Sequence, residues 1–189
     1  MRLGMAKDRD VDEHEKLREL ILYIAQKCQD HPRFGAVKLN KILFFADFIA
    51  YAKRGKSITG ETYFKLPQGP APKKLKPVVE QLTESGQAVE QLRRVLAWSQ
   101  RRLIPLREPN LSVFSGEEIS LVDEVIEALK HKDAKEVSAL SHTFAGWKLV
   151  PDNEDIPYET VFLRDPADIL VTEKQLQQAK AIAKEHGLQ

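Results

Sequence analysis

The sequence is short of cysteine and of long apolar runs, and both absences restrict the class of protein. Its 189 residues include one cysteine, Cys28, which excludes a disulfide within the chain and suits a reducing cytoplasm. Apolar runs fall well short of the roughly 18 residues that a membrane-spanning helix needs. The first residues also lack the apolar core of a signal peptide. We therefore expect a cytoplasmic protein with no membrane partner.

Residues that hold metals or perform covalent catalysis are equally sparse. The five histidines are scattered and, with one cysteine, show no zinc-ligand spacing. No glycine-rich phosphate loop, G-x-S-x-G or H-E-x-x-H motif occurs. Cys28 and His31 are close in sequence, but Cys28 continues the apolar stripe of a predicted helix, where a thiol acts as a small buried hydrophobe. We expect no catalytic residue, metal or cofactor, and an enzyme is the weakest interpretation.

An excess of charge of either sign is also missing overall, although the charges are unevenly distributed. The chain has 29 basic and 28 acidic residues, yet twelve basic and four acidic residues lie within 53–107. Residues 108–150 and 151–189 each carry four basic and eight acidic residues. A basic middle and an acidic second half can bind partners of opposite charge or neutralise each other within the fold. The sequence leaves both alternatives open.

Apolar residues recur at helical spacing over much of the chain. The segment 35–54 is apolar around most of its circumference, which predicts a helix buried on several sides. Ser115 with Glu118, and Asp133 with Glu136, have the spacing of capping boxes. The predicted helices cover about 12–28, 35–54, 72–86, 115–129, 133–140 and 172–187.

The connection between the second and third helices is rich in proline and glycine. Thr62-Tyr63-Phe64 favours a strand, whereas the prolines and glycine that follow, Pro67, Gly69, Pro70 and Pro72, predict an irregular segment. The third helix is expected to begin near Pro72, or nearer Leu75 because Pro77 would otherwise kink it.

Residues 88–106 read as a β-hairpin with Trp98-Ser99-Gln100 at its tip. The sequence therefore predicts a single domain, residues 1–189, of mainly α class (α+β). Its small antiparallel β-sheet, a hairpin, is inserted after the third helix. Four arginines on the hairpin, Arg93, Arg94, Arg101 and Arg102, favour an alternative function: a winged-helix-like regulator that grips DNA phosphates. Affinity for duplex DNA that falls steeply with salt would support this alternative, and no binding at low salt would remove it.

An acidic, irregular stretch follows between Asp152 and Asp168. It is either a packed surface loop or a recognition surface for another protein. Its Phe162 is expected in the core, whereas an aromatic residue at the hairpin tip suits an interface anchor. The residues predicted to bind a partner are Trp98, Asp152, Glu154, Asp155 and Tyr158.

Several separated segments, taken together, resemble the Panacea domain of SocA-like antitoxins. They are Lys38-Leu39-Asn40-Lys41-Ile42-Leu43-Phe44-Phe45-Ala46-Asp47, Gly60-Glu61-Thr62-Tyr63-Phe64, Gly69-Pro70-Ala71-Pro72, Leu140-Ser141-His142-Thr143, Trp147 and Ile156-Pro157-Tyr158. The family-like core covers about 15–165, and 166–189 would form a C-terminal helix. These residues are expected to be architectural, with His142 buried, hydrogen-bonded and packed beside the Trp147 indole. The set is Leu39, Lys41, Asp47, Gly69, Pro70, Pro72, Ser141, His142 and Trp147.

The resemblance implies a mainly α protein that neutralises a separate toxin by binding it. In some members it also implies presentation of the toxin to a protease. The leading hypothesis is therefore an antitoxin whose partner is a toxin encoded by the adjacent gene. Promoter DNA is a further candidate partner, and the identity of the toxin and the oligomeric state are left open.

Overall fold

The computed structural model describes residues 13–95 and 98–163. The predicted helix from Thr172 lies outside this part of the chain. The described helices are α1 (Glu13–Lys27), α2 (Ala36–Arg54), α3 (Leu75–Glu84), α4 (Gly116–Leu129), α5 (Ala134–His142) and α6 (Ala145–Leu149), with the 3-10 turns η1 (Leu111–Val113) and η2 (Tyr158–Phe162). None of these helices combines the length and the apolar character required to cross a bilayer.

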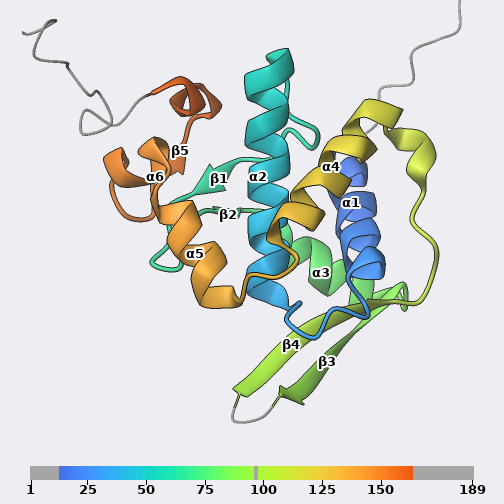
Figure 1. Ribbon diagram of the computed structural model, residues 1–189. Coiled ribbons are helices and arrows are strands. Elements are labelled where there is room, and N and C mark those ends of the chain that lie inside the picture. Colours follow the sequence, from blue (N-terminus) through green and yellow to red (C-terminus); the bar gives the residue numbers. More distant parts are fainter. Residues whose placement is uncertain (1–12, 96–97, 164–189) are drawn as a thin grey trace, which may run out of the picture.

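Helix α2 is the central element around which the other elements pack (Figure 1). Helices α1 and α4 lie along one side of it, while α5, α6 and the short strands β1 and β2 lie on the other. It ends at Gly55, whose φ of 70° is left-handed and whose N–H donates to the Tyr51 carbonyl at 2.8 Å. Glycine adopts this conformation at little steric cost, which explains the sharp end of the helix.

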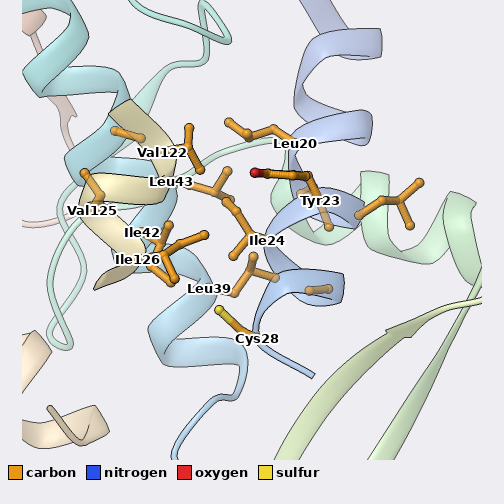
Figure 2. Packing of buried hydrophobic residues seen from close by; sticks show 14 of the residues in the cluster. Leu20, Tyr23, Ile24, Cys28, Leu39, Ile42, Leu43, Val122, Val125 and Ile126 are labelled. Carbon is orange, nitrogen blue, oxygen red and sulfur yellow. The ribbon is translucent and has the colours of Figure 1, made fainter. Parts of the chain in front are cut away.

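The main apolar core lies between α1, α2 and α4. Figure 2 shows Leu20 and Ile24 of α1, Leu43 of α2 and Val122 of α4 within this cluster. Each of these four side chains is fully buried. Cys28 is almost completely buried in the same cluster, and burial raises the pKa of its thiol to about 11. The thiol therefore stays protonated at neutral pH and serves as a packing group.

The strands form two small antiparallel sheets, which confirms the mainly α class with a hairpin after the third helix. Strands β3 (Ala88–Val95) and β4 (Trp98–Pro105) make the hairpin, in which Val95 pairs with Trp98. Trp98 therefore opens the second strand instead of starting the predicted tip.

The second sheet has the strand order β2-β1-β5, with β1 at Tyr63–Phe64, β2 at Ala71–Pro72 and β5 at Asp155–Ile156. The expectation of an irregular segment through Pro72 is thus wrong at its end. Proline is tolerated there because β2 is an edge strand, where a missing N–H breaks no ladder bond. Helix α3 consequently begins at Leu75, the later of the two predicted starts.

Both predicted capping boxes are present. The Ser115 side chain accepts from the Glu118 N–H at 3.2 Å, and the Glu118 carboxylate accepts from the Ser115 N–H at 2.9 Å. Asp133 and Glu136 make the same pair of bonds at the start of α5. These reciprocal bonds satisfy donors that an uncapped helix would leave free, so they fix where α4 and α5 begin.

Candidate functional site

Asp47 of α2 is the centre of a buried hydrogen-bond network. Its carboxylate accepts from the backbone N–H groups of Ile58 and Thr59, each at 2.9 Å, and from the Tyr63 hydroxyl at 2.7 Å. It also accepts from the Thr59 hydroxyl. Burial raises the pKa of Asp47, while the four hydrogen bonds act in the opposite direction. The network ties the loop between α2 and β1 to the middle of α2.

A second polar group, which we term the motif cluster, comprises Lys41, Gly69, Pro70, Ser141, His142 and Trp147. The Lys41 ammonium donates to the Pro70 carbonyl at 2.8 Å. The rings of His142 and Trp147 are stacked with 3.9 Å between centroids. The Trp147 indole N–H donates to the Leu66 carbonyl at 3.1 Å. Six of the nine family-motif residues thus meet where the turn 66–70 packs against α2, α5 and α6.

The geometry of the motif cluster does not assemble a nucleophile with a base. The Ser141 hydroxyl donates to the Ser138 carbonyl at 2.8 Å, so its one proton is not directed to His142. His142 Nε2 is buried without a hydrogen-bond partner among the described residues. Burial and the nearby Lys41 charge lower the pKa of His142, although a backbone hydrogen bond at Pro67 opposes them. The stacked, neutral imidazole therefore acts as a packing element.

The remaining motif residues lie outside this cluster but are also structural in position. Leu39 is buried in the main core. Pro72 is buried in β2, opposite Tyr63. Asp47 forms the separate network described above.

Lys41 has an unusual environment for a lysine. It is 2% exposed, and no carboxylate among the described residues pairs with it. Burial lowers the pKa of its ammonium from 10.5 to about 8. Keeping the Lys41 ammonium charged therefore costs free energy at neutral pH, because the group that stabilises it is the neutral Pro70 carbonyl.

This environment predicts a specific pH dependence of stability. Above pH 8 the folded protein loses the Lys41 proton, whereas the unfolded chain keeps it until about 10.5. Because the unfolded state then binds more protons, the free energy of unfolding rises with pH, by up to about 3 kcal/mol in this window. Urea denaturation at pH 7 to 10 measures the rise, and Lys41→Met removes it. If the free energy of unfolding rises equally steeply with pH in the unchanged protein and in Lys41→Met, this assignment is contradicted.

The four hairpin arginines do not share one environment. Arg102 is 5% exposed, and its guanidinium donates to the carbonyls of Cys28, Gln29 and His31 at 2.8–3.1 Å. It fixes the hairpin to the end of α1, so the prediction that it contacts nucleic acid is corrected. Arg93, Arg94 and Arg101 are exposed and form no ion pair within the described chain. DNA contact by these three remains a prediction.

The residues predicted to bind a protein partner also differ in their environments. Glu154 is exposed, and Asp152 and Asp155 are exposed while pairing with Lys65 and Lys73. Tyr158 instead stacks on Tyr51 with 5.2 Å between centroids. Its hydroxyl donates to the Glu61 carbonyl at 2.6 Å, so packing is its main role. The structure separates Trp98, on the hairpin, from this segment (Figure 1).

One apolar feature of this surface was missed by the sequence reasoning. Phe162 is 62% exposed, so its predicted place in the core is wrong. Leu149 and Leu163 are also exposed. Tyr158, and not Phe162, fills the space beside Phe48. We term this face, formed by Asp152, Glu154, Asp155, Glu159, Phe162 and Leu163, the acidic surface.

Among the described residues, no group of three or more histidine, cysteine, aspartate or glutamate side chains could hold a metal ion. The model for the family "Antitoxin SocA-like, Panacea domain" matches residues 39–148, more than half of the chain. The chain therefore belongs to this family. Searches of curated proteins and of solved structures found no match.

Proposed function

We propose that the protein is an antitoxin that neutralises a toxin encoded by the adjacent gene through direct binding. The family match over residues 39–148 carries this proposal. The protein performs no bond chemistry in this account, which is consistent with the structural roles of Lys41, Ser141 and His142. Delivery of the bound toxin to a protease would be a later step, and a shorter toxin half-life in cells containing the antitoxin would support it.

The acidic surface is the face that we propose for toxin binding. Between Pro151 and Leu163 the chain carries four carboxylates and no basic residue. All four are exposed, although Asp152 and Asp155 pair with Lys65 and Lys73, and Phe162 is exposed in the same segment. An exposed aromatic side chain in a segment rich in carboxylates fits a basic surface that contains an apolar pocket. A toxin that binds nucleotides or RNA has such a basic active site, and covering it would stop its activity.

Reversal of charge on this face tests the proposal. We expect Asp152→Lys with Glu154→Lys to weaken toxin binding by about ten- to a hundredfold, since like charges would then face each other across the interface. Growth rescue on co-expression with the toxin, and the Kd by calorimetry, measure the effect. The matched control is Asp30→Lys with Glu84→Lys, because both residues are exposed and lie outside the acidic surface. Equal binding by the two double variants would reject this face.

A further inference from the structure

A pocket lies between the loop that follows α1 and the end of α4. Its cavity volume is about 390 Å³, within the range of small-ligand sites. Four of the five residues that line it carry a cationic side chain or an imidazole, and none of the five carries a carboxylate: His31, Pro32, Arg33, Lys130 and His131. We term it the α1–α4 pocket.

Two cationic side chains join the walls of the α1–α4 pocket. Arg33 Nη1 donates to the His131 carbonyl at 2.8 Å, and the buried Lys38 ammonium donates to the Lys130 carbonyl at 2.9 Å. Both carbonyls directly follow the last residue of α4. Unpaired carbonyls at a helix end present partial negative charge, which would repel an anion. The two hydrogen bonds offset this charge and fix the two segments relative to each other.

The ion pairs around the pocket leave an excess of positive charge. Lys130 pairs with Glu127 at 3.4 Å, so these two charges offset each other. The cations of Arg33, Lys38 and Arg102 have backbone carbonyls as partners, and none of the three forms an ion pair within the described chain. A hollow next to cations that lack a counter-charge attracts an anion.

The environment of the His31 imidazole agrees with this excess. Burial lowers the pKa of His31, and the charges of Lys130 and Lys38 lower it further. Glu127 and Asp30 act in the opposite direction with smaller effects. Cations therefore dominate the electrostatic potential at this ring, and a bound anion would stabilise its protonated form.

We propose that the α1–α4 pocket binds a phosphate group, either as the free anion or as the monoester of a small molecule. The exposed Arg33 guanidinium offers paired N–H donors that match phosphate oxygens, and the Lys130 ammonium adds a second charged donor. Several donor side chains in one pocket suit the phosphate dianion better than a carboxylate, which has a single charge and two oxygens. The pocket shares no residue with the acidic surface, so the proposal does not depend on the toxin contact.

Calorimetric titration of the full chain with inorganic phosphate, AMP and adenosine tests the proposal. We expect saturable binding of phosphate with a Kd of about 1 mM or lower, and no binding of adenosine. Tighter binding of AMP than of phosphate would support a nucleotide as the source of the group, whereas equal or weaker binding of AMP would support the free anion. The proposal is overturned if neither phosphate nor AMP saturates the protein, or if adenosine binds as tightly as AMP.

A matched pair of variants locates the bound phosphate. Arg33→Glu should weaken phosphate binding at least tenfold, because it replaces a donor by a like charge. The control Arg94→Glu makes the same change of charge at an exposed hairpin position outside the lining and should alter binding less than twofold. Circular dichroism establishes that each variant is folded, and Lys130→Gln provides the test if Arg33→Glu is not. Equal losses in Arg33→Glu and Arg94→Glu would overturn the proposal, because they would indicate a general attraction of anions to the chain.

Nuclear magnetic resonance of the histidine rings gives a measurement that a merely structural role of Arg33 would not change. Saturating phosphate should raise the pKa of His31, because the bound anion stabilises the imidazolium. The ring chemical shifts of His14, at the start of α1 and outside the lining, should not respond. A pKa of His31 that is unchanged by phosphate would overturn the proposal.

Discussion

Replacing Asp47 by alanine is expected to lower the free energy of unfolding by about 3–5 kcal/mol, the cost of breaking a buried charged network. The substitution leaves two buried N–H groups, of Ile58 and Thr59, and the Tyr63 hydroxyl without their acceptor. Each unsatisfied buried donor costs roughly 1–3 kcal/mol. Because Asp47 is fully buried, water cannot easily replace its carboxylate as the acceptor for these donors. Urea denaturation followed by circular dichroism measures the loss.

Asp123→Ala is the matched control for this prediction. Asp123 also accepts from a tyrosine hydroxyl, that of Tyr23 at 2.7 Å, and pairs with Lys27. Its side chain is 42% exposed, however, so water replaces the lost partner and the expected cost is below about 1 kcal/mol. Similar losses in Asp47→Ala and Asp123→Ala would show that the network does not hold the loop to α2.

Gly69→Ala is expected to destabilise the fold by about 3–5 kcal/mol, through backbone strain and overpacking together. Gly69 has a φ of 97°, which an L-residue rarely adopts. A Cβ atom there would lie 2.8 Å from Lys41 Nζ and closer still to Ser141 Oγ. Both neighbours are buried, so neither can move without disturbing the motif cluster. Thermal and urea denaturation measure the loss.

Two other glycines separate backbone strain from steric overlap. Gly55 and Gly86 have φ values of 70° and 68°, and an added Cβ would meet nothing within 4 Å. Gly55→Ala and Gly86→Ala should therefore cost only about 1–2 kcal/mol, the cost of the left-handed conformation alone. A loss in Gly69→Ala no larger than in these controls would mean that the turn 66–70 does not pack tightly against α2 and α5.

The helices could be predicted from the sequence because their signals are local. The capping boxes at Ser115 and Asp133 and the apolar circumference of α2 need no knowledge of distant residues. Strand β5 could not be predicted in this way, since its two residues pair with Tyr63 and Phe64 from far along the chain. Its pattern is too short to show an alternation.

The same contrast between local signals and contacts of distant residues applies to the candidate sites. The family resemblance predicted that His142 lies beside Trp147, and their rings are stacked in the structure. It did not predict that the turn at Gly69 packs against Ser141. Charge counting did not distinguish Arg102 from Arg101, because the difference depends on three carbonyls at the end of α1.

Complex formation with the adjacent gene product tests the central claim most directly. The purified full chain is mixed with that product and examined by size-exclusion chromatography with light scattering, and the toxin's activity is measured in the same fractions. The account predicts one stable complex of defined stoichiometry in which the toxin is inactive. Two separate peaks, or a complex in which the toxin keeps its full activity, would contradict it.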